Sequence, residues 1–338
     1  MSVKYPSIFV RSANEFGKHI SNKKFPMDQA MLLINDVKQN KDSYWKDNLH
    51  HSQIEKEKFV RSAKGKPLGR LLEHINEDVL GPHDHLLSKV IFGGIQKSDH
   101  VKAASYLLGG KRKRTLLAMD IKSFFEQIHH DRVFHFFYKK CGCDKRIAKL
   151  FADLACVPLG LKGSDGQLVL ARGFSTSSRL AIWTNVELFE RMTHIVYRKL
   201  KGHDPRVAVF VDDIGITASR VNLQQMQELR DEIMVLFMEF DKNQPLEIHP
   251  ISKKQKNKIV EHSEGIEHLG LRLYRNRLSA GAKTLSRKQK HENKREKLVT
   301  TEQRRYHKVV TKGHSRYNGY VRSAKPLHKK VKDTGRKY

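Results

Sequence analysis

The sequence predicts a mixed α/β (α+β) fold in which short apolar strands end in acidic residues. Residues 207–211 and 214–218 form apolar runs rich in β-branched side chains, and residues 115–119 form another short apolar run, as expected of strands. Elsewhere, as in residues 222–240, apolar residues recur at helical spacing. A chain of 338 residues is long enough for a sizeable core and for two or three subdomains.

Residues 206–219 read RVAVFVDDIGITAS, so two apolar runs flank the adjacent carboxylates of Asp212 and Asp213. This pattern predicts a tight β-hairpin with the acids at its tip, although Asp also suits an ordinary polar turn. Asp120, at the end of the run 115–119, favours a functional role. A strand that delivers one carboxylate beside a hairpin that delivers two would gather three hard oxygen ligands. Such ligands suit a pair of Mg²⁺ ions that activate a 3′-hydroxyl and stabilise departing pyrophosphate.

The residues MDIKSFF around Asp120 resemble the first palm motif of reverse transcriptases, and FVDD at 210–213 resembles their catalytic hairpin. The likeness is closest to the bacterial branch that holds retron, group II intron and antiphage-defence enzymes. It covers about residues 59–270 and implies a right-hand polymerase with fingers, an antiparallel-sheet palm and a short basic thumb. It assigns catalysis to Asp120, Asp212 and Asp213. Two Mg²⁺ ions, or Mn²⁺ in their place, would be held by these side chains and the main-chain oxygen of Ile121.

The resemblance also divides the chain into subdomains. It implies an N-terminal extension at 1–58, fingers at 59–110, a palm at 111–275 with helices inserted at 129–170, and a basic thumb and tail at 276–338. In the family, basic residues of a fingers hairpin cover the phosphates of the incoming nucleotide. Residues 59–80 contain a basic, glycine-containing turn before an amphipathic helix. The corresponding positions are Lys64, Lys66 and Arg70, with solvated surface charges as the alternative.

Phe125 stands five residues after Asp120. In the family an aromatic side chain at this spacing packs under the deoxyribose and excludes a 2′-hydroxyl, which implies dNTPs as substrates. Core packing beside Phe124 is the alternative.

Residues 171–173 hold the main departure from the family, because Ala-Arg-Gly replaces the usual Pro-Gln-Gly. Arg172 and Gly173 are expected at the nucleotide or the templating base, since a guanidinium can bind phosphate or a base edge with two hydrogen bonds. The alternative is that Arg172 only replaces lost packing. The altered segment also raises a second hypothesis, a template-independent or protein-assisted DNA polymerase.

Three further positions follow from looser matches. Lys253 or Lys254, in PLEIHPISKK, stands where a family lysine can protonate the departing pyrophosphate, and the sequence does not decide between them. Gly270 matches the primer-grip hairpin, where glycine lets the backbone approach the primer. Lys97 is a candidate for contact with the template backbone.

The chain is strongly basic, with 65 Lys plus Arg against 36 Asp plus Glu, a net charge of +29 and a pI near 10.0. This balance indicates a polyanionic partner, and nucleic acid is the first candidate. Basic residues crowd the segment after residue 279, and there Arg287, Lys288, Arg304 and Arg305 are expected to grip a duplex, with a solvated face as the alternative. The expected partners are an RNA template, which a dedicated non-coding RNA could supply, a DNA or RNA primer and dNTPs. A protein partner or a homo-oligomer stays open.

No apolar run has the length that a bilayer needs, and no secretory signal begins the chain, so we expect a soluble, cytoplasmic protein without membrane contact. The expected function is RNA-directed DNA synthesis. Antiviral defence is the expected setting, because the sequence shows no endonuclease, maturase or integrase-like segment. A catalytically idle RNA-binding protein is the third hypothesis, and the presence of all three carboxylates argues against it.

Overall fold

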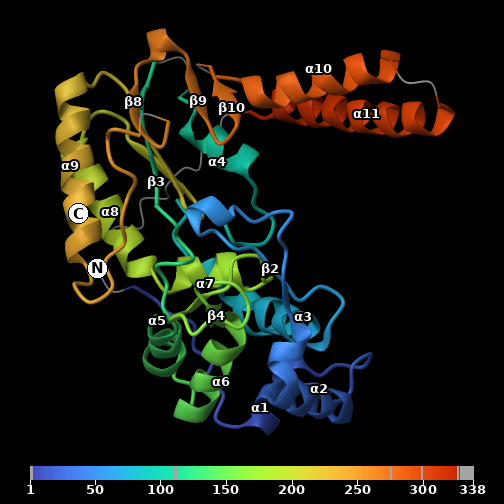
Figure 1. Cartoon of the computed structure of the whole chain (residues 1–338). Coiled ribbons are helices and arrows are strands. Elements are labelled where there is room, and N and C mark those ends of the chain that lie inside the picture. The colour runs from blue at the N-terminus through green and yellow to red at the C-terminus, as the bar shows by residue number, and fades with distance from the viewer. Residues whose placement is uncertain are drawn as a thin grey trace. The chain divides into compact units, whose positions relative to one another are not determined.

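The computed structural model describes residues 3–109, 113–253, 255–274, 276–297, 300–325 and 327. It consists of helices and antiparallel sheets, which confirms the mixed α/β class (Figure 1). The chain forms two compact units. The first unit comprises Met1–Lys97, Ile121–Met192 and Met234–Ile248, and the second comprises Ser98–Asp120, Thr193–Ile233 and His249–Tyr338. The division into fingers, palm and thumb stays a prediction.

The second unit is built on a four-stranded antiparallel sheet of strand order β6-β7-β3-β8. Its strands are β3 (Thr115–Asp120), β6 (Arg206–Phe210), β7 (Asp213–Ala218) and β8 (Asn257–Val260). The three apolar runs of the sequence therefore form strands, as predicted. Every residue of β3 is buried, which explains why residues 116–119 are all apolar rather than alternating with polar ones. Helix α4 (His100–Leu107) packs on β6 and β7.

A second antiparallel sheet and a helical hairpin complete this unit. The sheet consists of β9 (Ile266–His268), β10 (Leu271–Leu273) and β11 (Leu278–Ala280). Helices α10 (Ala282–Lys297) and α11 (Thr301–Ser323) lie side by side (Figure 1). Near its C-terminal end α11 is fastened to α4, because the hydroxyl of Tyr317 lies 2.7 Å from Nε2 of His100 and that of Tyr320 donates to Asp99 over 2.8 Å.

The first unit is mainly helical. Its helices are α1 (Ala13–Ile20), α2 (Met27–Asn40), α3 (Pro67–His74), α5 (His130–His135), α6 (Lys145–Ala155) and α7 (Ser177–Trp183). Short 3₁₀ or π turns cover Lys41–Tyr44, Ile54–Lys56, Ile75–Leu80, Gly81–Leu86 and Phe136–Lys140, and another, His262–Glu264, belongs to the second unit. Two small sheets pair β1 (Lys46–Asp47) with β2 (Arg61–Ser62), and β4 (Cys156–Pro158) with β5 (Leu168–Leu170). The amphipathic helix expected within 59–80 is α3, and it buries Leu71 and Leu72.

Two longer helices, α8 (Val186–Lys199) and α9 (Leu223–Glu239), contain residues of both units. Asn222 caps α9, since its side chain accepts from the amide of Gln225 over 2.7 Å. Met226, Ile233 and Phe237 are buried, as the helical spacing of the sequence requires. In the described part of the chain, no helix combines the length and the apolar character that a membrane span needs.

Candidate functional site

The tip of the β6–β7 hairpin presents Asp212 and Asp213. Phe210 pairs with Asp213, so Val211 and Asp212 form a two-residue loop. Val211 has φ +59°, a value that costs a β-branched residue steric strain and that this turn position normally assigns to glycine. Strain of this kind, about 1–3 kcal/mol, persists only where the surrounding structure holds the backbone. The sheet therefore fixes the position of the two acids.

Asp120 reaches the same place from the neighbouring strand. It ends β3 and lies directly opposite Asp213 in the antiparallel register. Facing residues of this kind have Cα atoms about 4.5–5.5 Å apart. Burial, followed by the charges of Asp212 and Asp120, raises the pKa of Asp213 to about 7. The structure thus brings the three predicted carboxylates together within the second unit.

Asp120 is 4% exposed, and two basic side chains hold it. Lys256 donates a short hydrogen bond to its Oδ2, and Nε2 of His249 lies 3.3 Å from its Oδ1. The amide of His249 also donates to the carbonyl of Asp120 over 3.0 Å. Burial lowers the pKa of Lys256, but the hydrogen bond and the charges of the three acids outweigh burial and raise it.

Sequence reasoning did not single out Lys256. The lysine lies one residue before β8, whose first residue, Asn257, pairs with Met119. This register delivers Lys256 to the end of β3. Lys253, one of the two lysines between which the resemblance does not decide, is exposed, and its amide donates to the carbonyl of Pro250 over 3.0 Å. Lys254 lies outside the described residues.

The carboxylates fit a divalent cation in their chemistry more than in their arrangement. Their oxygens are the ligands that Mg²⁺ prefers. The negative charges of Asp212 and Asp120 repel that of Asp213, and a bound cation would relieve this repulsion. Among the described residues, however, no group of three or more His, Cys, Asp or Glu side chains is arranged to hold a metal ion. Asp120 instead faces Lys256 and His249. Ile121 follows Asp120 directly and forms a β-bridge with Ile248.

Phe125 and Arg172 lie together in the first unit. The Arg172 guanidinium stacks 4.8 Å from the ring centroid of Phe125, which is 7% exposed. Its Nε and Nη2 donate to the two carboxylate oxygens of Glu126, each over 2.8 Å. Phe124 is fully buried and meets Phe189 edge-on. A charge paired with two hydrogen bonds inside the unit favours the packing alternative for Arg172. Glu126 gave no signal in the sequence, since it lies 46 positions from Arg172.

Gly173 has φ +102°, and an added Cβ would lie 2.5 Å from the carbonyl oxygen of Arg61. The amide of Arg61 donates to the carbonyl of Arg172 over 2.7 Å. Because Gly173 has no side chain, β2 can pack closely against residues 171–173. Nothing in these contacts requires a nucleotide.

The other basic candidates of the first unit lie on its surface. Lys64, Lys66 and Lys97 are exposed, and Lys66 immediately precedes α3. Arg70 is exposed and its guanidinium lies 4.4 Å from the ring centroid of Phe25. These side chains are accessible to a polyanion.

The remaining candidates belong to the second unit. Leu269 and Gly270 both have positive φ, at +54° and +71°, and form the turn between β9 and β10. An added Cβ at Gly270 would meet nothing within 4 Å, so turn conformation alone accounts for the glycine. On α10 and α11, the predicted duplex contacts Arg287, Arg304 and Arg305 are exposed, and Nζ of Lys288 lies 3.6 Å from Glu292.

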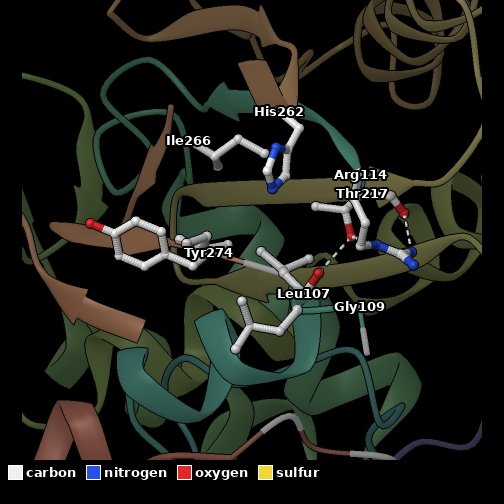
Figure 2. A pocket seen from close by; sticks show the side chains of 9 residues that line it. Leu107, Gly109, Arg114, Thr217, His262, Ile266 and Tyr274 are labelled. Atoms are coloured by element: carbon white, nitrogen blue, oxygen red, sulfur yellow. Dashed lines mark hydrogen bonds between the residues drawn. The ribbon is translucent and has the colours of Figure 1, made fainter. Parts of the chain in front are cut away.

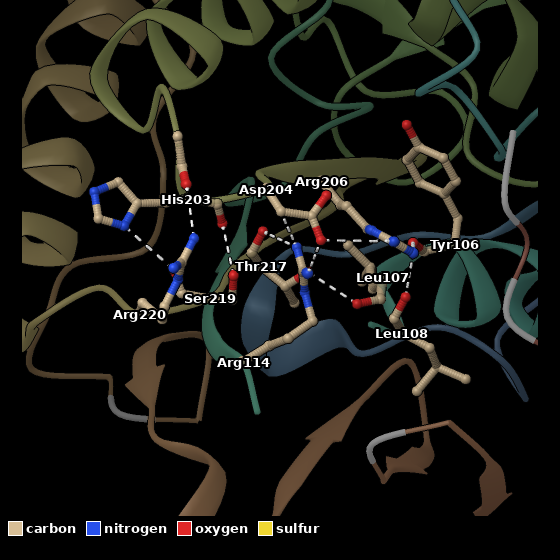
Figure 3. A network of polar contacts seen from close by, with 11 residues as sticks. Tyr106, Leu107, Leu108, Arg114, His203, Asp204, Arg206, Thr217, Ser219 and Arg220 are labelled. Carbon is tan, nitrogen blue, oxygen red and sulfur yellow. Dashed lines mark hydrogen bonds and ion pairs between the residues drawn. The ribbon is translucent and has the colours of Figure 1, made fainter. Parts of the chain in front are cut away.

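A buried arginine supports the strands that carry the acids (Figure 3). Arg114, just before β3, donates through Nε to the hydroxyl of Thr217 over 3.0 Å and through Nη1 to Asp204 over 2.6 Å. It also donates to the carbonyl of Thr217 over 3.0 Å. Thr217 in turn donates to the carbonyl of Leu107 over 2.9 Å. These bonds tie β3 and β7 to α4 at the end opposite the acids.

A small pocket lies beside this network (Figure 2). Its walls are mostly apolar, and the Arg114 guanidinium at its edge is engaged by Thr217 and Asp204. The labelled lining residues are Leu107, Gly109, Arg114, Thr217, His262, Ile266 and Tyr274. None of the three acids lines this pocket.

No protein-family model matches the chain, and no curated protein matches it.

Proposed function

We propose that the chain is an RNA-directed DNA polymerase that extends a 3′-hydroxyl with dNTPs. The observation that carries the proposal is the arrangement of the acids: Asp120 lies opposite Asp213, and Asp212 occupies the adjacent hairpin loop. The resemblance of MDIKSFF and FVDD to reverse-transcriptase motifs supports the same activity. Antiphage defence is the proposed setting.

In this proposal Asp120, Asp212 and Asp213, with the main-chain oxygen of Ile121, hold two Mg²⁺ ions. When bound, such ions would activate the 3′-hydroxyl and stabilise the departing pyrophosphate. The strained hairpin and the paired strands fix the backbone that carries the carboxylates. Lys253 or Lys254 is the proposed proton donor to pyrophosphate, as the resemblance implies.

The remaining roles follow the proposed right-hand architecture. The second unit supplies the palm sheet and, through α10 and α11, the basic thumb that contacts the RNA template and its primer. The first unit supplies the fingers, in which Lys64, Lys66 and Arg70 bind the nucleotide phosphates. Phe125 selects deoxyribose by excluding a 2′-hydroxyl.

One observation favours a second candidate, template-independent or protein-assisted DNA synthesis. Arg172 stands where the family has glutamine, and its guanidinium is bound to Glu126. The segment therefore cannot present the amide that the family places against the templating base. The same carboxylates would serve this reaction.

The test is the double substitution Asp212→Asn with Asp213→Asn. We expect it to abolish labelled dNTP incorporation on a primed RNA template, because amide oxygens carry no charge to hold Mg²⁺. RNA affinity should stay within about twofold, since it depends on basic residues elsewhere. Asp231→Asn, which removes a 60% exposed carboxylate of the same unit, is the matched control and should leave incorporation intact. Undiminished synthesis by the double variant would end the assignment.

A further inference from the structure

We infer that Lys256 is a built-in counter-ion of the carboxylate cluster, which holds Asp120 until a divalent cation displaces it. The inference rests on the proposed function, because it concerns the metal-binding step of that site. It reconciles two observations, namely that three acids gather at one place and that they are not arranged as a metal cage.

The contacts of Asp120 set up the competition. Its Oδ2 accepts from the Lys256 ammonium group, and its Oδ1 faces Nε2 of His249 at 3.3 Å. A metal ligand must offer a lone pair to the ion, so the oxygen that binds Lys256 cannot also bind the ion in the same direction. A divalent ion that approaches Oδ2 along this direction therefore has to displace the ammonium group.

Lys256 is the partner that can move. Its side chain is 50% exposed, whereas that of Asp120 is 6% exposed. The strand of Asp120 pairs with β7 on one side and β8 on the other, which fixes its backbone. The lysine has four rotatable side-chain bonds and a direct path to water, so its ammonium can leave without moving the sheet.

The charges favour this exchange. Three carboxylates interact with the Lys256 ammonium, which supplies only one positive charge among them. Excess negative charge therefore remains to attract a divalent ion. Without the ammonium, the ion would meet the full negative charge of the acids and no competing cation. Removal of Lys256 should accordingly tighten divalent binding on the order of tenfold, the worth of one charge-assisted hydrogen bond.

The experiment measures Mn²⁺ binding to the full chain without nucleic acid, by the electron paramagnetic resonance of the free ion. We expect Lys256→Met to bind Mn²⁺ about tenfold more tightly than the wild type and Lys256→Arg, which keeps a cation, to bind much like the wild type. Lys253→Met removes one charge from the same turn without removing the bond, and should change affinity by less than about twofold. Lys256→Gln repeats the test if the methionine variant does not fold.

A second measurement uses the unaltered protein. Addition of Mg²⁺ should shift the ¹⁵N signal of the Lys256 ammonium toward that of a solvated lysine. Equal Mn²⁺ affinity in folded wild type and Lys256→Met, or an unmoved Lys256 signal at saturating Mg²⁺, would overturn the inference while leaving metal binding intact. Absence of Mn²⁺ binding in every variant would overturn both the inference and the proposed two-metal function.

Discussion

Asp213 carries the clearest unfavourable contribution to stability in the candidate site. Its carboxyl group is largely buried beside Asp212 and Asp120, and all three effects raise its pKa to about 7. The preceding loop adds the backbone strain of Val211 at φ +59°. Unfavourable groups gathered at one place are typical of sites kept for function rather than for stability.

A stability measurement tests this electrostatic cost. The pKa of Asp213 is higher in the folded chain than its ordinary value of 3.8, so the group favours folding below about pH 4 and loses that contribution as the pH rises through 7. We expect the stability of Asp213→Asn relative to the wild type to be greater at pH 8 than at pH 5, by about 2 kcal/mol. Urea unfolding with a chelator present measures the difference. If that difference is the same at both pH values, the charges around Asp213 are not coupled as described.

Arg172, which the sequence singles out, forms an ion pair with Glu126 that the sequence does not reveal. It is 21% exposed and Glu126 is 11% exposed, so the two charges depend on each other. Arg172→Gln should cost about 3 kcal/mol, because it leaves a largely buried carboxylate without its cation. Adding Glu126→Gln should recover most of that loss. A double-mutant cycle by urea denaturation measures the coupling, and strict additivity would show that the pair contributes nothing.

The earlier expectation for Arg172 concerns template use and stays a prediction. If this arginine contacts the nucleotide or template, products of the wild type should be biased or template-free, and products of Arg172→Gln should move toward faithful copying. Sequencing both products on a mixed-sequence primed template measures this. Faithful copying by both proteins would leave Arg172 with only its packing role beside Phe125.

At the scale of elements, the sequence was most informative where local patterns were strong. The apolar runs predicted β3, β6 and β7, and helical spacing predicted α9. The β4–β5 hairpin was not predicted, since each of its strands has only three residues. Local sequence patterns also could not predict the register of strand pairs or the contacts between residues far apart in the chain. The role of Lys256 depends on how β8 pairs with β3, and Arg114, part of a basic run, is buried because Thr217 and Asp204 receive its donors.

The contact between β7 and β9 gives an element-scale prediction. A Cβ at Gly215, in β7, would lie 2.6 Å from Nε2 of the buried His268 and 2.6 Å from Leu107. Gly215→Ala should therefore destabilise the chain by about 1–3 kcal/mol, as overpacking of a core does. Gly319→Ala is the matched control, because its Cβ would meet nothing within 4 Å and alanine favours the helical conformation of α11. Thermal unfolding compares them. A Gly215→Ala protein as stable as the wild type would show that β7 does not need this close approach.

At the scale of the whole molecule, the dominant feature is the net charge of +29. The surface of α10 and α11 carries part of this charge, and exposed aromatic residues such as Tyr306 and Tyr320 accompany it. Basic side chains bind phosphates and release counter-ions, while aromatic rings stack on bases. This surface therefore suits the nucleic-acid partner that we propose.

The most direct measurement supplies the purified chain with a primer on an RNA template of mixed sequence, four dNTPs and Mg²⁺, and sequences what is made. We expect DNA that begins at the primer 3′-end and is complementary to the RNA, and we expect none from the protein carrying Asp212→Asn with Asp213→Asn. If the DNA has a sequence unrelated to the template, synthesis is not templated, and the template-independent alternative is supported. No extension under these conditions, by a folded wild-type protein that binds the primed RNA, would contradict the proposal that this chain is a polymerase.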